Sequence, residues 1–451
     1  MKIHYYSRLR AREFTGLSTF QFLAFFRRSI VYTFLSIYLR SLGLSTTEVT
    51  LMATVGMIGN TLAQSLLWGN LLDKYRRPTE FVVAGEFFAG VAHIFMVLGY
   101  MFFLGLNQLI IAGYVIIFSL GGIEVFWSMS NVGWSALISE LTEDDERKQL
   151  MGQFSIIGGF GGIGGALLGG ILYENGIGFA SGIIFIIAAV VMIFSSIIVY
   201  FSVRLGRDDE SQESDDESSE SFSLSDLPSQ LRMGYLIFIV ALVFINFGRN
   251  SIAIITALFV QDPTGFNATG IEIALYSNVR SVASMIAGLL IGSVVAKTDD
   301  NRVMVSGVAL SIAGISWLIV APTFSLALLA SFLRGASEVI INASSYSIVA
   351  RMTPKEYRGR LFAYYNATFF LSWGIAATLI AGPIADILIG QGFSNANAYR
   401  GSFVAAILLI FIGVAILLYS YRYIRKHNLY KFNEVEVPPI DSEIDSRYEA
   451  L

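Results

Sequence analysis

The stretch that decides the fold is residues 47–78, TEVTLMATVGMIGNTLAQSLLWGNLLDKYRRP. Its first part, residues 47–69, is mostly apolar and is long enough to cross a bilayer as a helix, which takes about 20 residues. Its second part gathers charge within a few positions, at Asp73, Lys74, Arg76 and Arg77. An apolar run followed by a basic segment predicts a transmembrane helix and the loop that ends it.

The composition extends this prediction to the whole chain of 451 residues, of which 55% are hydrophobic and only 14% are charged. A soluble core does not need so many apolar side chains, whereas twelve spans of about 20 residues would use nearly all of them. Long apolar runs bounded by charges predict an all-α membrane protein with twelve transmembrane helices near residues 15–41, 47–69, 79–103, 108–139, 147–173, 178–203, 233–261, 270–296, 302–321, 324–351, 358–389 and 400–424.

Several classes of site are excluded by residue type. The chain has no cysteine, which rules out disulfides, thiolate metal sites and cysteine nucleophiles, and its three histidines are too scattered for a metal cluster. The formal net charge of −4 is dominated by an acidic run at residues 208–220. We therefore expect neither a metal site nor nucleic-acid binding.

The basic residues predict the orientation of the chain in the membrane. Of the 30 lysines and arginines, 23 fall on the side that holds both predicted termini, and only Arg40 and Arg400 fall on the other side. The positive-inside rule then makes both termini cytoplasmic, in a multi-pass protein that we expect in the plasma membrane. The remaining five arginines lie inside predicted spans: Arg27, Arg28, Arg249, Arg280 and Arg334.

The order of spans and linkers predicts two halves. Residues 1–205 would form the N-terminal six-helix half, 206–230 an acidic cytoplasmic linker, 231–426 the C-terminal six-helix half, and 427–451 a flexible cytoplasmic tail. The halves echo one another, because Arg27-Arg28-Ser29-Ile30 matches the RNSI sequence at 249–252, and Asn131 matches Asn342. Internal repeats in membrane proteins indicate transport by alternating access.

The segment after the second predicted helix resembles the signature loop of the major facilitator superfamily. That signature is a glycine, three residues, an aspartate, a basic residue, one residue that is usually glycine, and two basic residues; here Tyr75 replaces the second glycine. The resemblance implies a secondary active transporter, not an enzyme, with the twelve helices arranged as two six-helix halves. It also implies a cytoplasmic gate built from Gly69, Asp73, Lys74, Arg76 and Arg77.

The fifth predicted helix is rich in glycine. Gly152, Gly161, Gly165-Ala166 and the pair at 169–170 are similar to the antiporter motif of the superfamily, with alanine in place of its proline. Close helix packing through small residues explains the same pattern equally well. The GxGxxG at residues 159–164 follows no strand, so we expect no dinucleotide site and no cofactor.

The candidate substrate site follows from the charges inside the spans. A charge at mid-bilayer costs at least about 2.5 kcal/mol, so such residues face the protein interior or a wet cavity. In the fold that the resemblance implies, helices one, four, seven and ten line that cavity. The substrate-binding candidates on them are Arg27, Arg28, Arg249, Asn131 and Asn342. Because Arg27 and Arg249 are internal counterparts, we expect them to face one another and to bind an anionic group.

Two glutamates on the same helices are candidates for proton coupling, Glu124 and Glu338. Arg334 and Glu338 are four residues apart and can pair on one helix face. Glu124 has no basic residue within four positions, so its partner must come from another helix.

Two substrate classes remain open. The arginines favour a small organic or phosphate-like anion, whereas the fifth helix and several aromatic residues suit a multidrug or lipophilic-compound exporter working as a proton antiporter. The aromatic candidates for a substrate wall are Phe126, Trp127, Trp134, Tyr364, Tyr365 and Trp373. A membrane enzyme is disfavoured because neither HExxH nor GxSxG occurs. The expected partners are a small-molecule substrate, the lipid bilayer and protons, with the chain acting as a monomer.

Overall fold

The computed structural model describes residues 9–142, 144–203, 227–297, 299–353 and 358–430. Within this part of the chain the secondary structure is helical, without strands. Among the described residues, eleven helices are long and apolar enough to cross a membrane. A twelfth rod runs over residues 46–75 as α2 (Thr46–Ala63), the π-helical η1 (Gln64–Trp68) and α3 (Gly69–Tyr75). The predicted linker at 206–230 and the tail at 427–451 lie largely outside the described residues.

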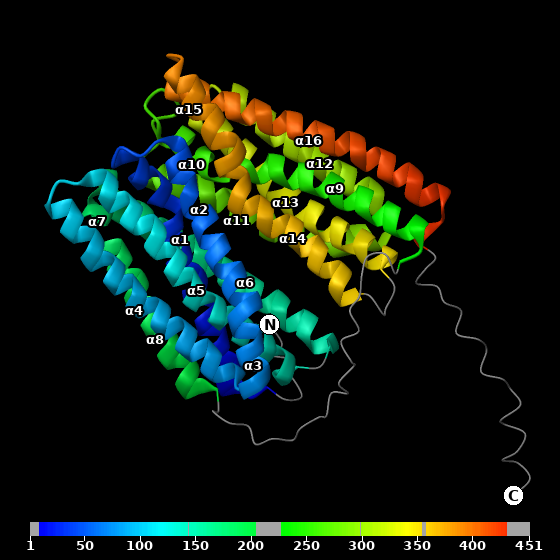
Figure 1. Cartoon of the computed structure of the whole chain (residues 1–451), viewed down its shortest axis with the longest axis horizontal. Coiled ribbons are helices and arrows are strands. Elements are labelled where there is room, and N and C mark those ends of the chain that lie inside the picture. The colour runs from blue at the N-terminus through cyan, green and yellow to red at the C-terminus, as the bar shows by residue number, and fades with distance from the viewer. Residues whose placement is uncertain (1–8, 143, 204–226, 298, 354–357, 431–451) are drawn as a thin grey trace, which may run out of the picture.

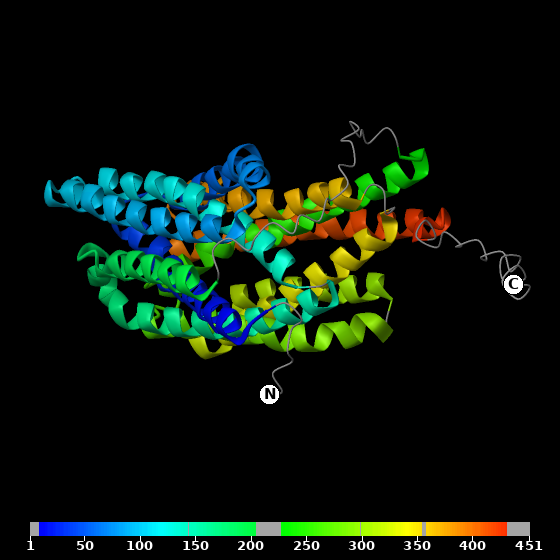
Figure 2. The same ribbon diagram turned by 90° about the horizontal axis from the view of Figure 1, so that it is seen from below.

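The helices pack in two groups, which Figures 1 and 2 show from two directions. Besides α2, η1 and α3, the first group contains α1 (Ala11–Ser41), α4 (Pro78–Gly105), α5 (Leu109–Leu141), α6 (Asp144–Tyr173), η2 (Glu174–Gly176), α7 (Ile177–Ala180) and α8 (Ile183–Ser202). The second contains α9 (Ser229–Ser251), α10 (Ala253–Gln261), α11 (Gly270–Lys297), α12 (Asp300–Val320), α13 (Phe324–Met352), α14 (Arg358–Ala376), the π-helical η5 (Ala377–Ala381), α15 (Gly382–Gly390) and α16 (Asn395–Lys426).

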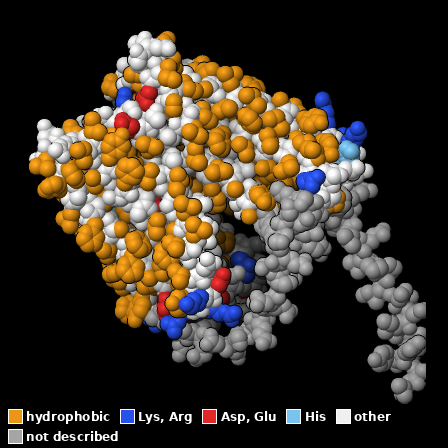
Figure 3. All heavy atoms as spheres, in the orientation of Figure 1, with side chains coloured by type: hydrophobic (Ala, Val, Ile, Leu, Met, Phe, Trp, Pro, Cys, Tyr) orange, Lys and Arg blue, Asp and Glu red, His pale blue; other side chains and the backbone are white. Residues whose placement is uncertain are grey.

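We name the two ends of the bundle by the chain. The terminal face holds the start of α1 and the end of α16, and the distal face holds the turns between α1 and α2 and between α15 and α16. In Figure 1 the two groups lie close together at the distal face, near α10 and α15, and diverge toward the terminal face. Figure 3 shows a mostly hydrophobic outer surface and a hollow between the groups on the diverging side, with a basic side chain visible in it.

Contacts between the groups lie toward the distal face. The hydroxyl of Thr54 on α2 donates to the carbonyl oxygen of Gly374 at 2.5 Å and lies 2.8 Å from the hydroxyl of Thr378. Gly170 of α6 and Gly270 of α11 meet backbone to backbone, so that a Cβ on either would come within 2.7 Å of the other's carbonyl oxygen. The structure is therefore closed at the distal face and open toward the terminal face.

The predicted spans agree with the observed helices within a few residues, with three corrections. The second span extends to Tyr75 and ends where Arg76 adopts a left-handed conformation just before Pro78. The sixth begins at Ile183, because the left-handed Gly182 separates it from α7. The seventh is interrupted at Ile252, whose backbone, at φ −92° and ψ 0°, departs from helical geometry between α9 and α10.

The glycines of α6 pack this helix against α1. A Cβ on Gly161 would lie 2.1 Å from the carbonyl oxygen of Phe22, and one on Gly165 would lie 2.1 Å from that of Phe26. Only glycine permits this approach of two helix backbones, as in other membrane helix pairs built on small residues. The glycine pattern thus has a packing role in this protein.

We expect Gly165→Ala to destabilise the protein by about 1–3 kcal/mol, because the added methyl forces α1 and α6 apart. Gly152→Ala is the matched control on the same helix, since a Cβ there meets nothing within 4 Å. Alanine is the better helix former by about 1 kcal/mol, so the control should be neutral or slightly stabilised. Thermal unfolding of the purified protein in detergent measures both, and equal unfolding temperatures for the two variants would contradict the packing role.

Candidate substrate site

Arg27 of α1 forms a buried ion pair with Glu86 of α4. Its Nη2 lies 2.8 Å from a carboxylate oxygen of Glu86, and the side chains are 7% and 0% exposed. Breaking a buried pair by removing one partner typically costs about 3–5 kcal/mol, because the remaining charge is left without compensation. Arg27 therefore ties α1 to α4, and its charge is neutralised within its own half.

The neighbouring Arg28 has no such partner. It is exposed, and no hydrogen bond or ion pair joins it to another described residue. Its guanidinium lies 5.5 Å from the ring centre of Trp127 on α5, while that of Arg27 lies 5.3 Å from the same ring. The two arginines thus flank one indole, and Arg28 is the one whose charge remains available.

Glu124 of α5 accepts hydrogen bonds from two other helices. The hydroxyl of Tyr32 on α1 donates to one oxygen at 3.0 Å, and the amide of Asn60 on α2 donates to the other at 2.9 Å. As expected, the partners of Glu124 come from other helices, although they are neutral groups. Neither partner was predicted; the signal that could have found them is a polar side chain within an apolar span.

In the second half, Arg249 of α9 lies among neutral acceptors. Its Nε donates to the side-chain oxygen of Asn246 at 2.9 Å, and its Nη2 donates to that of Asn342 on α13 at 2.7 Å. Its Nη1 is buried and has no hydrogen-bond partner among the described residues. The helix break at Ile252 is three residues away, and broken membrane helices are a frequent feature of transporter binding sites.

The expected pairing of Arg334 with Glu338 on α13 is wrong. Glu338 instead pairs with Arg280 of α11, with a nitrogen to oxygen distance of 2.7 Å, while Arg334 donates to the hydroxyl of Thr256 at 2.9 Å. Four-residue spacing makes a pair within one helix possible, but a packed neighbouring helix offers a closer approach. Arg280 also lies over Trp373, 5.9 Å from its ring centre.

The charges inside the bundle do not cancel. Five arginines and three glutamates, Glu86, Glu124 and Glu338, leave a formal excess of +2. The two ion pairs account for Arg27 and Arg280. No described carboxylate forms an ion pair with any of the other three arginines, Arg28, Arg249 and Arg334. An anion would compensate this excess.

The other predicted site residues have varied surroundings. Asn131 is partly buried on α5, one helical turn from Trp127. Trp134 stacks on Phe20 with ring centres 5.1 Å apart, so it belongs to the packing between α1 and α5. The ring of Phe369 on α14, which was not among the predicted aromatic residues, lies 5.7 Å from the guanidinium of Arg249.

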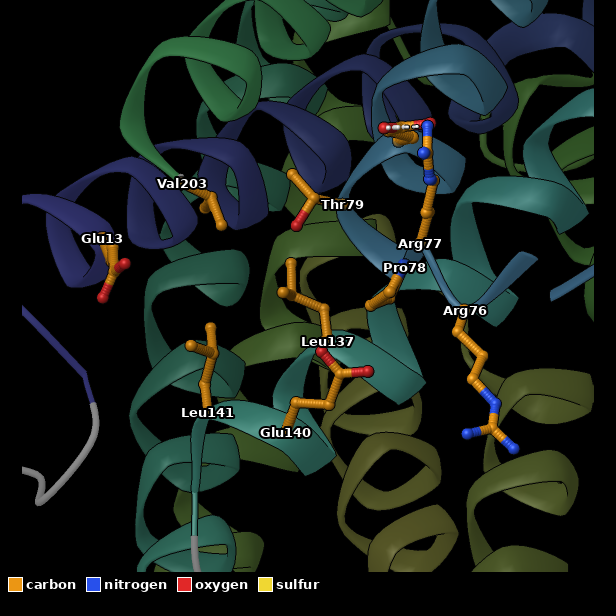
Figure 4. Close-up of a pocket in the computed structure, with 10 residues that line it drawn as sticks. Glu13, Arg76, Arg77, Pro78, Thr79, Leu137, Glu140, Leu141 and Val203 are labelled. Carbon is orange, nitrogen blue, oxygen red and sulfur yellow. Dashed lines mark hydrogen bonds and ion pairs between the residues drawn. The ribbon is translucent and has the colours of Figure 1, made fainter. Parts of the chain in front are cut away.

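The predicted gate segment lies at the terminal face. Gly69 follows the π-helical η1 directly, and Asp73 is exposed without a hydrogen bond or ion pair to a described residue. Lys74 lies over the ring of Tyr75, and Arg77 pairs with Glu80 at 3.1 Å on the surface. Arg76 and Arg77 border a small cavity of about 70 Å³ that also touches α1 and α5, shown in Figure 4.

Comparisons with known proteins agree with this architecture. A family model described as the Major Facilitator Superfamily matches residues 17–377 and 239–444. A protein named multi-drug resistance efflux pump PmrA homolog, from Lactococcus lactis subsp. lactis (strain IL1403), is 21% identical over 416 residues, which cover 89% of this chain and 93% of that protein.

Two solved structures show the same fold at low sequence identity. The inward-facing, unoccupied structure of a bacterial homologue of the human lysosomal transporter Spinster has a TM-score of 0.72 at 13% identity, covering 92% of this chain and 97% of that one. The nucleoside transporter NupG has a TM-score of 0.63 at 12% identity, covering 90% and 98%.

Proposed function

The chain belongs to the Major Facilitator Superfamily and is a multi-pass membrane transporter, and we propose that its substrate is a small organic or phosphate-like anion. The observation that carries this proposal is the buried Nη1 of Arg249, which has no hydrogen-bond partner among the described residues. A buried charged donor left without a partner is costly, so an occupant that supplies the missing acceptor would be favoured.

Arg28 supports the same proposal from the other half. It is exposed near the middle of α1 and rests on Trp127 without a carboxylate partner. Arg27, its neighbour, is held by Glu86, so we assign the anion-binding role in the first half to Arg28. A guanidinium binds phosphate or carboxylate through a planar fork, which a lysine cannot reproduce. Asn342, already bonded to Arg249, would orient that arginine, and Asn131 remains a candidate contact.

The second candidate is export of lipophilic compounds. It is favoured by the multi-drug efflux name of the Lactococcus lactis relative, and by the aromatic rings of Trp127, Phe369 and Trp373 beside the arginines. The formal excess of +2 inside the bundle disfavours a cationic drug, because bringing a further positive charge there adds repulsion.

We expect a small anion to stabilise the purified chain against heat, by about 2.7 kcal/mol at a hundred times its dissociation constant. The probes are inorganic phosphate and citrate, with tetraphenylphosphonium as the lipophilic cation. Arg28→Gln and Arg249→Lys should each lose the stabilisation by the anion. Uptake of that anion into proteoliposomes then tests transport.

Arg422→Lys is the matched control, because Arg422 is exposed near the end of α16 and should keep the full effect. If tetraphenylphosphonium stabilises the protein and neither anion does, the second candidate replaces the first. If an anion stabilises both arginine variants as much as it stabilises the parent protein, the anion binds elsewhere.

We propose that the terminal face is cytoplasmic and that the protein lies in the plasma membrane. The support is the distribution of basic residues, 23 on the terminal side against two on the other. The chain has no native cysteine, so single cysteines report position cleanly.

In intact cells we expect Gln391→Cys, exposed at the distal face, to react with a membrane-impermeant maleimide. Lys426→Cys, exposed at the end of α16, should react only after the cells are permeabilised. The reverse pattern would invert the orientation.

We further propose that transport is coupled to protons through Glu124. Its two oxygens bond to neutral donors on α1 and α2, so its charge is not neutralised by a direct ion pair. Those donors tie three helices to one carboxylate, and protonation would weaken both bonds. Glu338 is the weaker candidate, because Arg280 already neutralises it.

Glu124→Gln should abolish the part of transport that depends on a pH gradient while leaving exchange of substrate across the membrane intact. The physical reason is that an amide cannot take up and release a proton at this position. Proteoliposomes with and without an imposed gradient separate the two activities. Glu272→Gln, at the distal end of α11, is the matched control. A response of Glu124→Gln to the gradient equal to that of the parent would exclude this role.

A further inference from the structure

Two rods of the bundle, one in each half, share the same construction. The rod at residues 46–75 runs from the distal to the terminal face and consists of α2, η1 and α3, while the rod at residues 358–390 runs the opposite way and consists of α14, η5 and α15. Each contains one five-residue π-helical segment. In each, the residue after that segment is a glycine followed four positions later by an aspartate: Gly69 with Asp73, and Gly382 with Asp386.

Asp386 binds the start of α2 across the boundary between the halves. One carboxylate oxygen accepts from the backbone N–H of Thr46 at 2.8 Å, and the other accepts from that of Thr47 at 2.8 Å. The first N–H groups of a helix have no partner within the helix and carry partial positive charge, so a carboxylate from outside stabilises them. The next N–H, of Glu48, bonds to Ser45 within the same half.

Gly382 permits this contact. A Cβ at this position would lie 2.8 Å from the Cα of Thr47 and 3.1 Å from the hydroxyl oxygen of Thr50. The start of α2 and the start of α15 are therefore as close as backbone sterics allow. Farther along the same interface, the hydroxyl of Thr54 bonds to α14 and η5. Polar contacts of this kind can be exchanged for water when the halves separate, so they can open repeatedly.

We propose that Asp386 is the latch of the distal face, and that Gly382 and Asp386 form a counterpart of the Gly69 and Asp73 gate at the opposite end of the paired rods. In the present conformation Asp386 is engaged, and Asp73 is exposed without a partner among the described residues. When the terminal face closes, Asp386 must release α2, while Asp73 takes up the gating role that the family resemblance implies. This inference rests on alternating access alone and is independent of the substrate and of the coupling ion.

The test uses Thr50→Cys in the otherwise cysteine-free chain. Thr50 is fully buried beneath Gly382, so its thiol reacts with a water-soluble maleimide only when the distal face opens. We expect Asp386→Asn to raise the labelling rate of purified protein in detergent about tenfold, by removing one charge-assisted hydrogen bond and the negative charge at the helix start. Asp73→Asn should lower the rate instead, because it weakens the alternative state.

A second variant weakens the same contact from the other side. Thr46→Pro deletes one of the two N–H groups that donate to Asp386, at the first helical position, where proline is well tolerated. The preceding Ser45 is already extended, at φ −63° and ψ 166°, as a residue before proline should be. This variant should raise the labelling of Thr50→Cys about as much as Asp386→Asn, although the carboxylate is intact.

Asp262→Asn is the matched control, since Asp262 is a buried aspartate at the same face whose partners, Thr264 and Asn395, lie in its own half. Its labelling rate should equal that of the parent. Parental rates in both Asp386→Asn and Thr46→Pro would overturn the proposal, as would an equal rise in the control. Failure of both variants to fold would also overturn it, because a contact that opens in every cycle cannot be essential for folding.

Discussion

A guanidinium inside a bilayer keeps its charge, so it must meet a carboxylate, a polar neighbour or a water-filled cavity. This constraint organises the interior of the transporter. Two of its five intramembrane arginines meet it with ion pairs between helices, Arg27 with Glu86 and Arg280 with Glu338. Each pair joins two helices of the same half, so these charges consolidate the halves and leave the boundary between them free to move.

Two of the remaining arginines, Arg249 and Arg28, form no ion pair with a described residue. Arg249 is held by two neutral amides beside a break in its helix, and Arg28 rests on an indole with its charge uncompensated. Polar groups that are fully satisfied make a rigid interior, whereas a group that lacks a partner marks a place where a ligand can supply one. Under the proposed function, an anion bound by Arg28 and Arg249 would compensate charge in both halves.

The positions of the spans could be predicted from sequence, but their partners could not. Hydropathy and bounding charges locate twelve rods because the bilayer sets their length. They do not reveal the break at Ile252, since a departure of one residue from helical backbone geometry leaves hydropathy unchanged. Likewise, sequence spacing shows that Arg334 can reach Glu338, but it contains no information on which helix lies alongside. Arg280 is 58 residues from Glu338 and still lies closer to it.

The latch at Asp386 was also present in the sequence, yet it could not be recognised there. Gly382 and Asp386 repeat the spacing of Gly69 and Asp73, but two residues at fixed spacing occur too often by chance to be noticed among the 42 glycines of this chain. Two features of the structure distinguish these two glycine–aspartate pairs from a chance repeat. It places both pairs directly after π-helical segments, and it sets the two rods side by side in opposite directions. Each aspartate is then near the face at which the other rod begins. When the two rods approach at one end, they separate at the other, so the latches at Asp73 and Asp386 need not be engaged together. Each state then keeps one latch, and the difference in free energy between the two states can stay small enough for transport.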